Sequence, residues 1–159
     1  ASKKSSFSEG DLLMSQIYLA GPFFSEEQVE RIQRIEQALE DNTTVSTFYS
    51  PRHHQESDYE MFSAGWAQDV YQRDMTEVTD AQAVVAILDF EHQTIDPGTA
   101  YELGVATMLN KPIIIFQEET VPVNLMVTES LHAYLKNDRE IQQYDFERMP
   151  KHAYIGEYL

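Results

Sequence analysis

Short apolar runs alternate along this chain with longer segments in which apolar residues recur at helical spacing. Residues 83–88 and 113–116 are almost unbroken apolar runs, which is typical of strands buried on both faces of a parallel sheet. Residues 16–20 and 45–49 are also β-prone, and each run stops at a Gly-Pro or Ser-Pro pair. The pattern therefore predicts strands at these places.

Helical periodicity lies between the runs. Ser25 followed by two glutamates predicts a capped helix that continues to about Glu40. A second helix is predicted from about residue 61 to 80, and a third is predicted to run to Leu109 with Thr99 as its N-cap. The predicted apolar side of the second helix holds Phe62, Trp66, Val70, Met75 and Val78.

The pattern weakens after residue 116, where residues 131–135 predict a short edge strand and residues 139–148 a last helix. Residues 1–13 have no apolar period and predict a flexible leader ahead of a single domain at residues 14–159. Because strands and helices alternate, we expect an α/β fold. It should be a flavodoxin-like, doubly wound, mostly parallel sheet of about five strands flanked by helices.

Composition narrows the classes of partner. The chain has 11 Lys and Arg against 27 Asp and Glu, a formal charge of −16, so its field repels a nucleic-acid polymer. It shows no apolar run of about 18 residues and no signal-peptide pattern, from which we expect a cytoplasmic protein without a membrane partner.

Some chemistries are excluded or disfavoured by residue types. The absence of cysteine excludes thiol nucleophiles and Cys-ligated zinc. His53 and His54 are adjacent, but no carboxylate or histidine partner stands at metal-site spacing, so we expect no metal there. We expect the protein to work without a cofactor.

Ligands of doubly wound sheets lie beyond the carboxyl ends of the strands. That rule gathers acidic and aromatic residues and no obvious cation, a composition that suits a flat heteroaromatic ring and a neutral polyol better than a phosphate. The set is Tyr18, Phe23, Phe24, Trp66, Asp74, Asp89, Asp96 and Glu102.

Asp96 and Glu102 allow two interpretations. Both flank the predicted start of the third helix, where carboxylates favour the helix dipole, and they could do no more than that. Their predicted convergence with aromatic residues at one sheet edge favours a functional site instead.

Four motifs in this order resemble the nucleoside 2-deoxyribosyltransferases, enzymes of nucleoside salvage that exchange the base of a 2′-deoxyribonucleoside. They are residues 17–23 (IYLAGPF), Trp66 with Asp74, residues 96–104 (DPGTAYELG) and residues 124–126 (NLM). The resemblance implies purine or pyrimidine deoxynucleosides and free bases as substrates. It also implies a homo-oligomer, dimer-based or hexameric, with active sites shared between subunits.

The resemblance also assigns roles to single residues. Glu102 is implied as the nucleophile and Tyr18 as the residue that orients it. Asp74 and Asp96 are implied to handle the nucleobase. The implied substrate-binding residues are Gly21, Phe23, Trp66, Asn124 and Met126, the last two reaching into a neighbouring subunit's site.

The residues suit this chemistry independently. Base exchange with retention needs two displacements at the anomeric carbon, and a carboxylate such as Glu102 can make the first attack. We expect Glu102 to be ionised because it lies in the first turn of the predicted helix. The leaving base needs a proton, and either Asp74 or Asp96 could carry it.

Two departures from the family pattern and two rival functions stand beside this hypothesis. Residues 22–23 are Pro-Phe where one branch of the family has a Trp, and Tyr158 is followed by Leu159 where that branch ends in Tyr.

A deoxynucleotide N-hydrolase would need phosphate-binding residues near the first strand, where Ser25 is the one candidate. A receiver module would need paired acids at residues 20–21, which are Ala-Gly.

Overall fold

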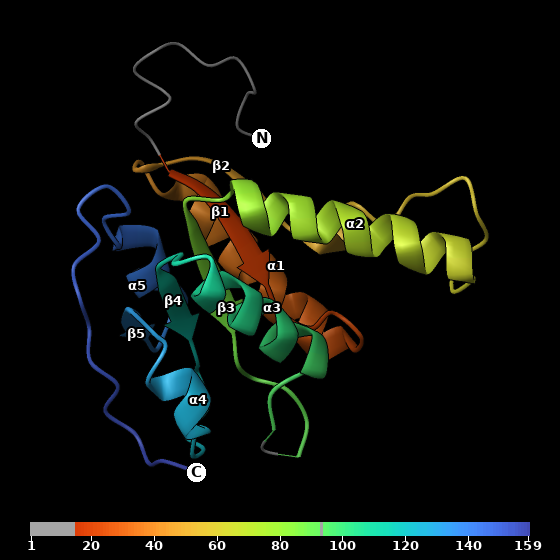
Figure 1. Ribbon diagram of the computed structural model, residues 1–159. Helices are drawn as coiled ribbons and strands as arrows, with labels where there is room; N and C mark the ends of the chain where they lie inside the picture. Colours follow the sequence, from red (N-terminus) through yellow and green to blue (C-terminus); the bar gives the residue numbers. More distant parts are fainter. Residues whose placement is uncertain (1–14, 93) are drawn as a thin grey trace.

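A computed structural model describes residues 15–92 and 94–159. Its five strands form one sheet in the order β2-β1-β3-β4-β5, with every neighbouring pair parallel (Figure 1). The strands are β1 (Ser15–Ala20), β2 (Val45–Tyr49), β3 (Ala83–Ile87), β4 (Ile113–Phe116) and β5 (Ala133–Leu135). The predicted flavodoxin-like sheet is therefore confirmed, and it is wholly parallel. The predicted leader, residues 1–13, lies outside the described residues.

Helices cover both faces of the sheet (Figure 1). They are α1 (Glu26–Asp41), α2 (Ala64–Asp80), α3 (Pro97–Met108), α4 (Leu125–Thr128) and α5 (Asp138–Gln143), and a 3₁₀ turn, η2 (Pro51–His53), follows β2. Side chains of α1 and α5 pack in one core, whereas those of α2, α3 and α4 pack in the other. Ser25 caps α1 as predicted, since its hydroxyl accepts from the backbone N–H of Gln28.

Successive residues of the central strands point to opposite cores. Ile17 and Leu19 of β1 face the α1–α5 side, while Tyr18 and Ala20 face the α2–α3 side. All residues of β3 and β4 are buried, which is why their sequences are continuous apolar runs. The alternation in β1 places Tyr18, which is 0% exposed, against the helices that carry Asp74 and Glu102.

The structure corrects three helix boundaries. The second helix begins at Ala64 rather than near residue 61, because the Ser63 side chain caps it and Phe62 has a positive φ of 68°. Phe62 is 83% exposed, so its predicted place on the apolar side is wrong; Val78 is buried there as expected. The last helix ends at Gln143 rather than at Arg148, because the next residue, Tyr144, has an extended backbone conformation.

The third correction concerns the helix that carries Glu102. The N-cap of α3 is Asp96, whose side chain accepts from the backbone N–H of Thr99, so the prediction of Thr99 as the cap is wrong. Pro97 occupies the first helical position, where its lack of an N–H costs nothing. Glu102 consequently lies in the second turn of α3 rather than in the first.

Candidate active site

Tyr18 of β1 and Glu102 of α3 meet on the face of the sheet that α2 and α3 cover. The buried Tyr18 hydroxyl donates a hydrogen bond to Oε2 of Glu102, which reaches it from α3. Asp96 fixes the start of that helix, since its Oδ2 accepts from the backbone N–H of Thr99 at 2.8 Å and from the Thr99 hydroxyl at 2.9 Å. The helix and the strand together therefore hold one carboxylate oxygen of Glu102 on a rigid donor.

The carboxyl group of Glu102 lies in a poorly hydrated environment. Its pKa is raised to about 8, mainly by burial and further by the neighbouring charges of Asp74 and Asp96, although the hydrogen bond from Tyr18 acts in the opposite direction. The expectation that the helix terminus keeps Glu102 ionised is therefore wrong. The helix dipole stabilises charge mainly within the first turn of a helix. Glu102 lies one turn further along α3, where the loss of hydration has the larger effect on its pKa.

Asp74 of α2 supplies a second carboxyl group with an altered pKa. Its pKa is raised to about 6 because burial outweighs the hydrogen bond from Tyr49 and the charge of Arg73, both of which lower it. Its charge also acts on both Tyr18 and Glu102. The structure thus brings three of the predicted catalytic residues, Tyr18, Asp74 and Glu102, into one cluster, with Asp96 at its margin as the cap of α3.

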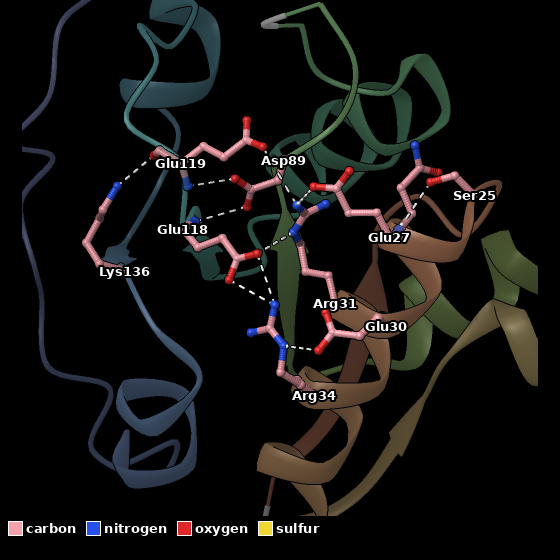
Figure 2. Close-up of polar contacts among 10 residues, drawn as sticks. Ser25, Glu27, Glu30, Arg31, Arg34, Asp89, Glu118, Glu119 and Lys136 are labelled. Carbon is pink, nitrogen blue, oxygen red and sulfur yellow. Dashed lines mark hydrogen bonds and ion pairs between the residues drawn. The ribbon is translucent and has the colours of Figure 1, made fainter.

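Asp89, in contrast, lies outside this cluster. Its side chain, 2% exposed, accepts from the backbone N–H groups of Glu118 at 3.0 Å and Glu119 at 2.8 Å, as Figure 2 shows. The Arg31 side chain from α1 donates to Glu118 at 2.7 Å in the same network. Asp89 therefore anchors the segment after β4 to the rest of the fold.

The predicted substrate-binding residues lie in different surroundings. Phe23 packs against the α1–α5 core, and its ring stacks on that of Phe24 with centroids 5.3 Å apart. Trp66 is half-buried, and its indole N–H donates to the carbonyl of Gln55 at 2.8 Å. Gly21 directly follows β1, where a Cβ atom would lie only 3.1 Å from the Ile87 side chain, so only glycine fits without movement.

Asn124 and Met126 begin the short helix α4. The Asn124 side chain accepts from the backbone N–H of Met126 at 2.9 Å and so caps the helix. The Met126 side chain is 74% exposed. Residues 157–159 run beside this segment, with hydrogen bonds between Val123 and Leu159 at 2.9 Å and between Leu125 and Leu159 at 3.0 Å.

Sequence reasoning did not single out Tyr49 or Arg73, and it assigned no role to His54. Tyr49 lies beside Tyr18 on the neighbouring strand, and its hydroxyl is 3.4 Å from Asp74 Oδ1. Arg73 donates to the carbonyl of His54 at 2.7 Å, and the His54 ring stacks on Tyr49. The available signal was register: the last residue of a β-prone run beside the first strand should lie next to Tyr18.

A cavity of about 260 Å³ lies at the carboxyl edge of the sheet, between the segments that follow β3 and β4. Its lining includes Leu88, Asp89, Ile95, Val123, Asn124 and Leu159, and it includes none of Tyr18, Asp74 and Glu102.

Within the described part of the chain, no group of three or more acidic or histidine side chains is placed to hold a metal ion. Of the helices described, none is long and apolar enough to cross a bilayer.

The fold and the site are those of an α/β enzyme that uses a pair of carboxyl groups for catalysis. Two helices on one face of a parallel sheet carry carboxyl groups with pKa values of about 6 and about 8, and the second of these groups is hydrogen-bonded to a buried tyrosine of the sheet. Such a pair can supply a nucleophile and a proton donor near neutral pH.

Comparison with known proteins identifies the family. The family model described as nucleoside 2-deoxyribosyltransferase matches residues 17–146. A nucleoside deoxyribosyltransferase of Limosilactobacillus fermentum is 31% identical over 135 residues, 77% of this chain and 79% of that protein. The chain thus belongs to the nucleoside 2-deoxyribosyltransferase family, as the motifs predicted, and is a pentosyltransferase.

Solved structures agree with this assignment. A 2-deoxyribosyltransferase from Bacillus psychrosaccharolyticus is 37% identical with a TM-score of 0.81, over 89% of this chain and 100% of that chain. The 2-desoxiribosyltransferase from Leishmania mexicana is 26% identical with a TM-score of 0.54, over 68% of this chain and 67% of that chain. The family acts on deoxynucleosides and free bases.

Proposed function

We propose that this enzyme exchanges the base of a 2′-deoxyribonucleoside by a retaining double displacement through a covalent deoxyribosyl ester of Glu102. The Glu102 carboxylate attacks C1′, the bond from C1′ to the base nitrogen breaks, and the base takes a proton. An incoming base then gives up its proton, attacks C1′ and releases the carboxylate. The observation that supports this most is the Tyr18–Glu102 hydrogen bond beside a second, partly buried carboxyl group.

We assign the proton transfer to Asp74 rather than to Asp96. The pKa of Asp74 is raised to about 6, so its carboxyl group can hold or release a proton near neutral pH. Asp96 is 9% exposed, and its Oδ2 already accepts two hydrogen bonds as the cap of α3. In this proposal Asp96 holds the nucleophile's helix and bounds the base site.

Gly21, Phe23 and Trp66 are proposed to shape the substrate pocket, and Asn124 and Met126 to complete the site of a neighbouring subunit. The exposed Met126 supports the second assignment. The apolar helix α3 supports an oligomer, because Tyr101 and Met108 on it and Leu109 directly after it are 54%, 82% and 41% exposed, and an exposed apolar face of this kind marks an interface. We propose a homo-oligomer that works in the cytoplasm without a cofactor.

The exchange reaction can be tested directly. Incubation with deoxyinosine and adenine should yield deoxyadenosine only when adenine is present, and Glu102→Ala should abolish it. Hydrolysis of deoxynucleoside monophosphates without base exchange would instead show the N-hydrolase activity and contradict the proposal.

The covalent step has its own test. After exposure to a slow 2′-fluoro-substituted nucleoside, intact mass measurement should show one added 2′-fluoro-2′-deoxypentosyl group, located on Glu102 by peptide mapping, with the free base released. Glu147→Gln, which changes an exposed glutamate after α5, serves as a control that should still be labelled. Unmodified protein, or label on another residue, would contradict the double displacement.

A further inference from the structure

Three aromatic rings form a continuous stack next to the catalytic cluster. Tyr18 and Tyr49 are register partners on neighbouring parallel strands, with ring centroids 5.8 Å apart and planes within 18°. The His54 ring also stacks on Tyr49, with ring centroids 4.3 Å apart and planes within 14°. Contacts with β1 and with the loop that follows η2 therefore hold the Tyr49 ring.

Both tyrosines of the stack point their hydroxyl groups at carboxyl groups of the site. The Tyr18 hydroxyl donates to Oε2 of Glu102, and the Tyr49 hydroxyl donates to Oδ1 of Asp74 at 3.4 Å. We propose that Tyr49 is a positioning residue that orients Asp74 for proton transfer to and from the nucleobase, as Tyr18 orients Glu102. This inference rests on the proposed function of Asp74.

The loop after η2 strengthens the arrangement. Arg73, the neighbour of Asp74 in α2, donates to the backbone carbonyl of His54 at 2.7 Å and to that of Glu56 at 2.8 Å. The loop that carries His54 is thus tied to the same helix turn that carries Asp74. Ring stacking and this anchor restrict the direction of the Tyr49 hydroxyl, so its bond selects one carboxylate oxygen of Asp74 and leaves the other for the base.

The bond also affects the charge state of Asp74. A hydroxyl that donates to a carboxylate stabilises the ionised form, which opposes the rise in the Asp74 pKa caused by burial. The charged and titratable groups around this pair are Tyr18 on β1, Tyr49 on β2, His54 in the following loop, Arg73 and Glu77 on α2, and Glu102 on α3. Removing the hydroxyl alone leaves the others in place.

Tyr49→Phe tests the inference because it keeps the stacked ring and deletes the hydroxyl. The pKa of Asp74 should rise by about half a unit. ¹³C NMR titration of the Asp74 carboxyl carbon, assigned by its loss in Asp74→Asn, measures this whether or not the enzyme turns over. Tyr144→Phe is the matched control: it removes a tyrosine hydroxyl bond of 2.7 Å to the carbonyl of Pro150, next to α5, and should leave the Asp74 titration unchanged.

Kinetics then test the positioning role. In the pH profile of kcat/KM for the donor nucleoside, the limb near pH 6 should move upward by the same half unit in Tyr49→Phe, while the limb near pH 8 stays. An unchanged titration, or a changed titration with an unchanged profile, would overturn the role of Tyr49. If the wild-type protein exchanged no base at all, the proposed function would fail instead, whatever the titration showed.

Discussion

Replacement of the proposed nucleophile should make this protein more stable at neutral pH. The pKa of Glu102 is raised from 4.5 to about 8 because the folded chain removes its carboxyl group from water and places it near Asp74 and Asp96. In the unfolded chain the group ionises near its ordinary value. Above pH 4.5 the unfolded state therefore releases this proton first, and the stability of the wild-type fold falls as pH rises towards 8.

The magnitude follows from the shift. At pH 7 the unfolded carboxyl group is about 2.5 pH units above its pKa, which corresponds to an upper value of about 3 kcal/mol at ~1.4 kcal/mol per unit. Relaxation and water entry around the half-buried side chain reduce this value, so we expect about 1–3 kcal/mol. Glu102→Gln removes the cost and keeps an oxygen that accepts the Tyr18 hydrogen bond. The unfolding temperature should rise by roughly 2–10 °C.

Thermal unfolding measured at pH 4 and at pH 8 provides the assay. The two proteins should unfold at similar temperatures at pH 4, where both side chains are neutral, and the variant should exceed the wild type at pH 8. Glu147→Gln makes the same change of charge at an exposed position and should show no such divergence. A gap between Glu102→Gln and the wild type that is the same at both pH values, or a less stable variant at pH 8, would refute the reasoning.

Three other predictions follow from the same structure. The pH profile of kcat/KM should be bell-shaped with limbs near pH 6 and pH 8, because one proton must be shared by Asp74 and Glu102; a flat profile between pH 5 and 9 would contradict this. Asp96→Ala should lower the free energy of unfolding by about 1 kcal/mol through loss of the α3 cap, whereas Asp96→Asn, which can still cap, should lower it much less in urea titrations. Met108→Glu, at an 82% exposed position of α3, should shift the protein to a smaller species in light scattering, and Gln142→Glu on α5 should not; an unchanged mass would exclude this face as an interface.

The sheet and the Tyr18–Glu102 pair could be predicted from the sequence because both leave local patterns in it. Unbroken apolar runs such as residues 83–88 occur where both faces of a strand are covered, and parallel strands bring their carboxyl ends to one edge. The motifs at residues 17–23 and 96–104 drew attention to Tyr18 and Glu102, which meet because β1 turns Tyr18 towards the face of the sheet that α3 covers. The carboxyl-edge rule failed for Asp89, because the backbone N–H groups of the next segment occupy its carboxylate.

The predictions failed where two local conformations are close in energy, or where contacts between residues distant in the sequence determine the outcome. Both Asp96 and Thr99 can cap a helix, and the choice is settled by Pro97, whose place at the first helical position makes Asp96 the cap. Phe62 fits a helical period, but Ser63 caps the helix after it and leaves it outside. Tyr49 carried no motif, and its role depends on the register between two strands.

The ionisation of Glu102 could not be predicted from sequence, and it changes how the proposed reaction must start. With pKa values of about 6 for Asp74 and about 8 for Glu102, the single proton that the pair shares at pH 7 rests mostly on Glu102. The displacement needs this proton on Asp74. The two pKa values differ by about two units, so moving the proton from Glu102 to Asp74 costs roughly 3 kcal/mol. A base nitrogen that accepts a hydrogen bond from protonated Asp74 stabilises that arrangement, so binding of the base both positions the substrate and frees the nucleophile. The burial that makes Glu102 costly to ionise thus links its activation to the presence of the correct ligand.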